Sequence, residues 1–247
     1  MYYKTICKAG KTIEVYRSYS KRTKKAKETG NRILTKEEIE ANNLRRAVVS
    51  LTRKLNANFD EKSCHLIFTY RTEERPTVKE SVKRIRNLLR NLGREYKKEG
   101  GELKYILVTE YHRGKVHHHV VVNGMPSGRT LETANSKWKY GYIKCSMLDD
   151  TGQYRKLAEY LIKETRKSYK EGKIGKQRYT SSRNLIIPKS KTKTVKADRW
   201  LPEPRIPKGY YLDKDTLYNG TDPFTGRLVQ KYTLIELRIE KGVKYGN

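Results

Sequence analysis

Apolar positions recur most regularly in the middle of the chain, where they predict a strand followed by a helix. Residues 64–70 (CHLIFTY) are mostly apolar, as in a buried strand. Apolar side chains then recur in alternating steps of four and three residues over 78–96, which predicts an amphipathic helix. Thr77 and Glu80 have the spacing of a capping box at its start, and the glycine pair at 100–101 is expected to end it.

The pattern continues with further strands and a second helix. Strand-type alternation covers 104–111 and 116–123, and the intervening Arg113-Gly114 is typical of a tight hairpin turn. A further strand is predicted over 140–148, and the spacing of apolar residues predicts a helix over 152–167. We therefore expect an α+β fold in which one mostly antiparallel sheet is covered by helices.

The two ends of the chain are patterned less strongly. Residues 11–16 alternate as a strand, a very basic stretch follows at 21–27, and a capping box at Thr35–Glu38 precedes a helical stripe that reaches Leu55. From about residue 189 onward Pro, Gly and Lys dominate, so we expect a loosely packed tail. One late strand within it is predicted by the alternation of Ile235, Leu237 and Ile239.

This organisation predicts three segments in a chain of 247 residues. Residues 1–56 form a basic N-terminal extension with a strand and a helix, and residues 57–190 form the strongly patterned central domain. Residues 191–247 form a basic C-terminal extension. The length allows either one large domain or one compact domain with such extensions.

Charge narrows the class of partner. The chain has 56 Lys and Arg against 27 Asp and Glu, a formal net charge of +29. This excess predicts a polyanionic partner, bound with an affinity that falls steeply as salt rises. A structural RNA-binding protein would show the same balance, so charge indicates nucleic acid without indicating any chemistry.

The sequence predicts neither export nor membrane insertion. No apolar run approaches the roughly 20 residues that a membrane span needs, and the N-terminal residues lack the apolar stretch of a signal peptide. The cysteines are isolated and odd in number, so they indicate neither a disulfide framework nor a zinc site, and a reducing cytoplasm is expected.

Three of the five histidines are consecutive and lie in the second strand of the predicted hairpin. Because side chains alternate faces along a strand, His117 and His119 project together while His118 points to the opposite face. His118 shares its face with valines and is expected to be a packed histidine. The pair on the other face is the candidate for function.

The register of the hairpin adds a carboxylate to that pair. With a two-residue turn, or a four-residue loop of the same register, Glu110 lies across from His117 on the same face, with His119 two residues along. A three-residue loop would shift the register and separate them. A carboxylate and two imidazoles suit Mn²⁺ or Mg²⁺. The alternatives are a histidine-rich surface strand and an accidental transition-metal site.

Tyr160 is the candidate nucleophile on the second predicted helix. It falls near the border of the apolar face, on the side shared with Lys156, Lys163 and Glu164, where a phenol can meet a ligand. Lys163 is one turn on, close enough to lower the pKa of the phenol or to steady a phosphate. The plain alternative is a boundary tyrosine beside a solvated lysine. A second Tyr-x-x-Lys match begins at Tyr211, in a segment without a helical pattern.

Taken together, these motifs resemble the HUH endonuclease superfamily, and more narrowly the rolling-circle replication initiators of small plasmids and single-stranded DNA phages. That family has a strand ending in Thr-Tyr, a His-hydrophobic-His strand and a helix with Tyr-x-x-Lys, matched here by 68–70, 117–119 and Tyr160–Lys163. Residues 105–110 (YILVTE) and 179–185 (YTSSRNL) also resemble this group. The middle histidine departs from the pattern, which leaves open which histidine binds if the strand carries a bulge.

The resemblance covers roughly residues 60–190 and implies a ferredoxin- or RRM-like sheet, with an HUH endonuclease domain at 57–190. It implies single-stranded DNA as the partner, presented as an origin hairpin or an unwound nick site, together with a host helicase and polymerase. The expected location is the cytoplasm of a bacterial host cell.

The resemblance also implies roles for single residues. The metal ligands it implies are His117, His119 and Glu110. Tyr160 would attack the scissile phosphate, leaving a free 3′-hydroxyl and a 5′-phosphotyrosine link, and Lys163 would stabilise charge on the phenolate or the phosphate. Lys156 and Arg183 would contact DNA, although a surface arginine often has no such role.

Two other functions stay open at this point. A non-catalytic, RRM-like nucleic-acid-binding protein would explain the charge and the sheet, and its tyrosines could stack on bases. It would leave Glu110 and two histidines on one strand face unexplained. A transposase or conjugative relaxase of the same superfamily would share the fold and the motifs. The chain has no appended helicase-like segment with a phosphate-binding loop, which favours a small initiator that recruits host machinery.

Overall fold

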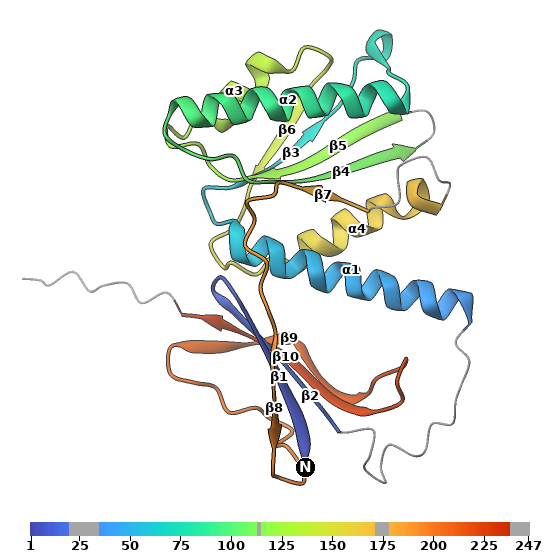
Figure 1. Ribbon diagram of the computed structural model, residues 1–247, viewed down its shortest axis with the longest axis vertical. Helices are drawn as coiled ribbons and strands as arrows, with labels where there is room; N and C mark the ends of the chain where they lie inside the picture. Colours follow the sequence, from blue (N-terminus) through green and yellow to red (C-terminus); the bar gives the residue numbers. More distant parts are fainter. Residues whose placement is uncertain (20–34, 113–114, 171–177, 238–247) are drawn as a thin grey trace, which may run out of the picture. The chain divides into compact units, whose positions relative to one another are not determined.

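The computed structural model describes four stretches of the chain (Figure 1), namely residues 1–19, 35–112, 115–170 and 178–237. The basic stretch at 21–27, the turn at Arg113-Gly114 and Ile239 lie outside them. The chain divides into two compact units, unit 1 (Met1–Asn43 and Pro188–Asn247) and unit 2 (Leu44–Ile187). Within the described residues, four α-helices combine with two antiparallel five-stranded sheets, so the predicted α+β class is confirmed.

Unit 2 is built on a sheet with the strand order β6-β3-β5-β4-β7, in which every neighbouring pair is antiparallel. Its strands are β3 (Cys64–Phe68), β4 (Tyr105–His112), β5 (Lys115–Val122), β6 (Ile143–Met147) and β7 (Thr180–Ser181). β3 and β5 lie at the centre, and from β3 to β6 the strands and α-helices follow the strand-helix-strand-strand-helix-strand order of a ferredoxin-like fold. All the strands predicted in this region form, and the short β7 is an unpredicted addition at one edge.

Helices cover both faces of this sheet (Figure 1). α2 (Val78–Lys98) and α3 (Thr130–Lys137) pack on one face, and a short 3₁₀ turn (Thr72–Glu74) precedes α2. α4 (Arg155–Lys170) and the C-terminal part of α1 (Lys36–Asn58) pack on the other face. Of the helices in the described stretches, none is both long enough and apolar enough to cross a membrane. Because helices pack on both faces, a polar side chain on either face of the sheet lies in a largely dry environment and needs a hydrogen-bond partner.

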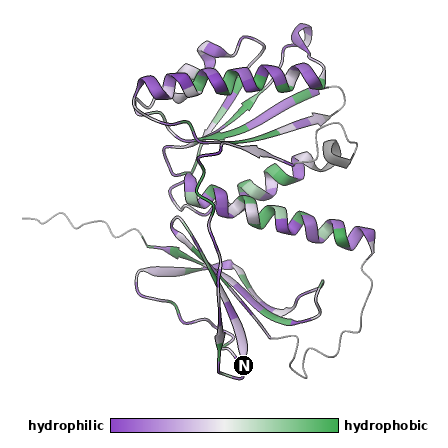
Figure 2. Ribbon diagram, viewed as in Figure 1, coloured by the Kyte–Doolittle hydropathy of each residue, from purple (hydrophilic) through white to green (hydrophobic). Residues whose placement is uncertain are grey.

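The local signals that predict α2 are all present in the structure. The Thr77 hydroxyl accepts a hydrogen bond from the Glu80 backbone, and the Glu80 carboxylate accepts one from the Thr77 backbone. Hydrophobic and hydrophilic patches alternate along the helix (Figure 2), and the largest buried side chains are Ile85, Leu88, Leu89, Leu92 and Tyr96. The helix ends at Lys98, and Gly100 adopts a φ of +74°, a value that glycine tolerates best.

Unit 1 is a second sheet, with the order β8-β1-β2-β10-β9. Its strands are β1 (Tyr2–Ala9), β2 (Thr12–Tyr19), β8 (Lys191–Val195), β9 (Tyr210–Thr221) and β10 (Leu228–Glu236). β2 pairs with β10, from Ser18 opposite Val229 to Thr12 opposite Ile235. The expectation of a loosely packed C-terminal tail is therefore wrong. The segments predicted as separate extensions, 1–56 and 191–247, both contribute strands to one sheet.

Gly141 lies where the chain passes very close to the end of β3. A Cβ at this position would clash with the Thr69 carbonyl oxygen and lie 2.8 Å from the Cα of Tyr70. The close approach is useful because the Thr69 N–H donates a hydrogen bond to the Tyr142 carbonyl, which continues the pairing of β3 with β6. Only glycine leaves room for the two backbones at this distance.

We predict that Gly141→Ala lowers the free energy of unfolding by about 1–3 kcal/mol, because one of the two backbones must move. Urea unfolding followed by circular dichroism measures the change. The control is Gly93→Ala in α2, where the nearest atom to an added Cβ is 4.0 Å away and alanine is the better helix former. Equal stability of the two variants would contradict the steric argument.

Candidate active site

The β4–β5 hairpin places two histidines and a glutamate on one face of the unit 2 sheet. Glu110 pairs with His117, as the two-residue turn register predicts, and alternation along β5 turns His119 to the same side. Oε2 of Glu110 lies 3.9 Å from Nδ1 of His117 and 3.6 Å from Nε2 of His119. The strand-face assignment made from the sequence is therefore confirmed.

His65, on β3, extends this group and was not predicted. Its Nε2 lies 3.2 Å from Nδ1 of His119, and the two rings stack with centroids 5.4 Å apart. The contact depends on the long-range pairing of β3 with β5, which no turn in the sequence fixes. The only signal was a histidine inside an otherwise apolar strand. Because His65 engages Nδ1, the other nitrogen of His119 faces Glu110.

The second nitrogen of His119 has no hydrogen-bond partner. Nε2 is buried, and the nearest Glu110 oxygen at 3.6 Å is beyond hydrogen-bonding distance. Buried polar atoms are rarely left in this state, which marks the position as one that can accept a ligand.

The side chains on this face offer the donor atoms that a divalent cation uses. In the described part of the chain, no group of three or more His, Cys, Asp or Glu side chains has the spacing to hold a metal ion as it stands. Octahedral Mg²⁺ binds oxygen at about 2.1 Å, which places neighbouring ligand atoms about 3 Å apart. The separations of 3.6 and 3.9 Å from Glu110 would have to shrink by less than about 1 Å. The types of donor atom suit such an ion, whereas their spacing in this structure is wider than its coordination shell.

Burial and neighbouring groups shift the pKa values on this face. Interaction with His119 holds the pKa of Glu110 below its usual value, against the opposing effect of burial. Burial lowers the pKa of His65 to about 4, and it lowers the pKa of His117 as well. These shifts favour uncharged His65 and His117 beside an ionised Glu110 at neutral pH, the protonation states that suit binding of a cation.

α4 brings Tyr160 edge-on to the two buried histidines. The Tyr160 ring centroid is 5.5 Å from that of His119 and 6.1 Å from that of His65, with interplanar angles of 78° and 69°. The next residues, Leu161 and Ile162, are buried, whereas Tyr160 is 41% exposed. The predicted border position of this phenol is confirmed, and the phenol is accessible to a ligand.

The expected lowering of the Tyr160 pKa by Lys163 is wrong. Burial raises the pKa of Tyr160, and the charges of Glu164 and Glu110 raise it further. Burial and the Glu110 carboxylate also raise the pKa of Glu164, on which the exposed Lys163 has the opposite effect. Glu164 follows Tyr160 by one helical turn. The sequence placed it on the correct side of the helix, but its proximity to Glu110 depends on tertiary packing.

Lys156 and Arg183, the two predicted DNA contacts, are both exposed. Lys156 lies in the first turn of α4, and Arg183 follows β7. Both are accessible to a DNA backbone. The group formed by the histidines, Glu110, Glu164 and Tyr160 does not include them.

Residues 63–168, the Rep segment, match the model of a family described as replication-associated protein ORF2. The Rep segment is therefore similar to the replication-associated (Rep) proteins of that family. The Rep segment contains every member of the group described above, namely His65, Glu110, His117, His119, Tyr160 and Glu164, and it also contains Lys163. A comparison with curated proteins and one with solved structures gave no match.

His118, between the two candidate ligands of the Rep segment, is fully buried on the opposite sheet face. Its Nε2 lies 2.9 Å from the Tyr70 hydroxyl and its Nδ1 lies 2.9 Å from the Thr109 hydroxyl, so both ring nitrogens have partners. Burial lowers the pKa of His118 to about 3. As predicted, it is a packed histidine, and the two hydroxyls explain why a polar residue is tolerated there.

We predict that neutral His118 makes the protein sensitive to acid. Its pKa falls from 6.5 in the unfolded chain to about 3 in the folded one, so the stability it contributes is complete above the unfolded value and is lost as pH falls toward 3. In chelator-containing buffer, the free energy of unfolding should drop more between about pH 7 and 4.5 for the wild type than for His118→Gln. Parallel pH curves from urea unfolding would contradict this role.

Proposed function

We propose that this protein is a replication initiator that nicks single-stranded DNA at an origin, with Tyr160 as the nucleophile and a divalent cation as the cofactor. One observation carries the proposal. An exposed phenol on α4 lies beside His119, whose buried Nε2 has no partner and faces Glu110. A phenol, a carboxylate and imidazoles that lie close together suit phosphoryl transfer to tyrosine.

The reaction we propose is an in-line displacement at phosphorus. The Tyr160 oxygen forms a bond to phosphorus while the bond from phosphorus to the 3′-oxygen breaks, which leaves a 5′-phosphotyrosine link and a 3′-oxygen that takes a proton to become a hydroxyl. Glu164 is the candidate acceptor of the phenol proton, because its charge already acts on Tyr160 and its raised pKa suits a general base. The covalent link keeps the phosphodiester energy for later rejoining, and the 3′-hydroxyl can prime a host polymerase.

This mechanism requires positive charge near the Tyr160 oxygen and the scissile phosphate. Burial and the charges of Glu164 and Glu110 raise the pKa of Tyr160, so the phenol is a poor nucleophile until that negative charge is offset. Mn²⁺ or Mg²⁺ bound by Glu110, His117 and His119 would supply that charge and polarise the phosphate. Lys163 would add charge near the phosphate, and Lys156 and Arg183 are candidates for contacts to the DNA backbone.

The alternatives explain less of the site. A non-catalytic nucleic-acid-binding protein would account for the positive charge of the chain. It would not account for the buried Nε2 of His119, which faces the Glu110 carboxylate and has no hydrogen-bond partner. A transposase or relaxase would use the same chemistry, and the family match to replication-associated proteins favours replication. We propose that the substrate is single-stranded DNA in an origin hairpin or an unwound nick site, and that a host helicase opens the duplex.

We predict that Tyr160→Phe abolishes the covalent protein–DNA adduct and leaves DNA binding nearly unchanged, because only the phenol oxygen is lost. Incubation with single-stranded origin DNA and Mn²⁺, followed by denaturing electrophoresis and peptide mapping, measures the adduct. Tyr211→Phe is the matched control, since Tyr211 has the same Tyr-x-x-Lys spacing and is 40% exposed on β9. If the adduct persisted in Tyr160→Phe and disappeared in Tyr211→Phe, Tyr160 would not be the nucleophile.

We also predict that His117→Ala and His119→Ala each weaken Mn²⁺ binding on the order of a hundredfold and lower nicking to a similar extent, since each removes one ligand. Electron paramagnetic resonance of free Mn²⁺ gives the affinity without relying on activity. His118→Gln lies on the same strand but faces the other side, so its Mn²⁺ affinity should stay near that of the wild type. Equal losses in all three variants would rule out the face assignment as the basis of metal binding.

A further inference from the structure

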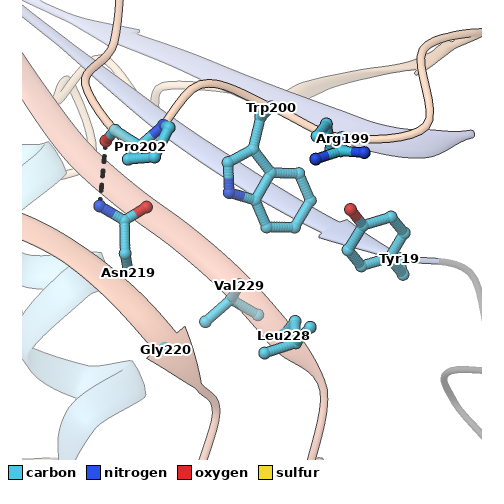
Figure 3. Close-up of a pocket in the computed structure, with 8 residues that line it drawn as sticks. All are labelled: Tyr19, Arg199, Trp200, Pro202, Asn219, Gly220, Leu228 and Val229. Atoms are coloured by element: carbon cyan, nitrogen blue, oxygen red, sulfur yellow. Dashed lines mark hydrogen bonds between the residues drawn. The ribbon is translucent and has the colours of Figure 1, made fainter.

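Unit 1 carries a pocket of about 230 Å³ that the proposed nicking reaction does not use (Figure 3). Residues from β2, β9 and β10 and from the loop between β8 and β9 line it, and those central to the argument are Tyr19, Arg199, Trp200, Asn219, Leu228 and Val229. In Figure 3 the Trp200 ring forms one wall, Val229 and Leu228 lie below it, and Arg199 lies beside Tyr19. The walls are largely aromatic and aliphatic, with a guanidinium at one side.

Aromatic rings define the upper wall of this pocket. Trp200 stacks on Tyr19 with ring centroids 4.7 Å apart and an interplanar angle of 29°, and the edge of Tyr2 contacts Trp200 at 5.2 Å. Tyr2 and Tyr19 are buried, whereas Trp200 is only partly covered. The indole is therefore supported by two tyrosines and still presents surface to the pocket.

The loop that carries Trp200 is held firmly against the sheet. The fully buried Gln230 donates hydrogen bonds to the carbonyls of Leu201 and Pro202, and the Tyr19 hydroxyl donates one to the carbonyl of Asp198. Gln230 also bonds Asn219, whose side chain donates to Pro202. Such anchoring lowers the entropy lost on binding, because the wall is already in position.

The pocket suits a flat, aromatic and uncharged group. Its volume is below the range of sites for drug-sized ligands, and its amide groups are already engaged with the protein. Stacking on an indole beside an arginine is the way in which proteins bind single-stranded nucleic acid without reading sequence. We propose that this pocket binds one unpaired base of single-stranded DNA, by stacking and with little base preference.

Charge supports DNA as the occupant. The sequence segments that make up unit 1 contain 24 Lys and Arg against 12 Asp and Glu, so unit 1 is strongly cationic on its own. Arg199 contributes an exposed cation at the pocket itself. A strand held by its phosphates near this surface would offer its bases to Trp200, and the replication-associated family that the Rep segment matches supplies the context in which unpaired DNA is present.

The fluorescence of Trp200 can report whether the pocket is occupied. The chain has two tryptophans, and the other, Trp138, is buried in unit 2 and donates a hydrogen bond to the Thr69 carbonyl. In a Trp138→Phe protein excited at a wavelength that tyrosine does not absorb, emission comes from Trp200 alone. We expect an oligo(dT) to quench this emission, and an abasic oligonucleotide of equal length and charge to bind about tenfold more weakly without quenching. Equal affinity of the two DNAs with unchanged emission would overturn the proposal.

Two surface variants test the pocket without disturbing the core. Leu228→Glu adds a carboxylate at the pocket, where Leu228 is 46% exposed, and Leu201→Glu adds the same charge at a residue 54% exposed that does not line it. Leu228→Glu should remove most of the preference for oligo(dT) over abasic DNA, whereas Leu201→Glu should retain it. Equal preference in both variants would contradict the assignment.

Trp200→Leu completes the test, because it keeps an apolar wall and removes the stacking surface. We expect it to bind both DNAs with the affinity that the wild type has for abasic DNA. All titrations are made with chelator present, so no nicking occurs and Tyr160 does not enter the result. A negative outcome would therefore leave the proposed nicking function standing, and failure of nicking would leave this proposal intact.

Discussion

The antiparallel pairing of β4 with β5 is the constraint on which the chemistry of unit 2 depends. Glu110 lies opposite His117, and strand alternation then sends His119 to the same face and His118 to the other. A shift of one residue would exchange these roles, because every side chain on a strand changes face together. Since helices cover both faces, each exchanged histidine would also lose the partners that its own layer provides. The register therefore fixes the fold and the candidate site at once.

The two buried histidines of β5 show how differently one residue type can be used on the two faces. Each ring nitrogen of His118 lies within hydrogen-bonding distance of a hydroxyl group, so burial leaves neither nitrogen without a partner. His119 has His65 at one nitrogen and nothing within hydrogen-bonding distance at the other. An unpartnered buried nitrogen costs about 1–3 kcal/mol, a cost that a bound cation would remove. Burial raises the pKa of Glu164 and of Tyr160, and the negative charge of Glu110 raises both further.

What the sequence could predict follows from how local each feature is. The β4–β5 hairpin, the α2 capping box and the border position of Tyr160 depend on neighbours within a few residues, and all appear as expected. His65 depends on the pairing of β3 with β5, which brings together residues more than fifty positions apart, and no local pattern determines it. The sheet of unit 1 is the extreme case, since β2 pairs with β10 from the other end of the chain. The Lys and Pro residues around those strands give a local composition typical of a loosely packed tail, and only the long-range pairing shows that they belong to a sheet.

The sign of the Tyr160 pKa shift shows the same limit for electrostatics. Helical spacing correctly places Lys163 near Tyr160, and a lysine considered alone would stabilise the phenolate. Burial beside the sheet and the carboxylates of Glu164 and Glu110 outweigh that effect, and both arise only when α4 packs on β4 and β5. If Tyr160 is the nucleophile, as proposed, its raised pKa would keep the phenol unreactive until the substrate and a cation offset the nearby carboxylates. The packing that reverses the pKa shift expected from helical spacing would then couple the reactivity of the phenol to assembly of the site.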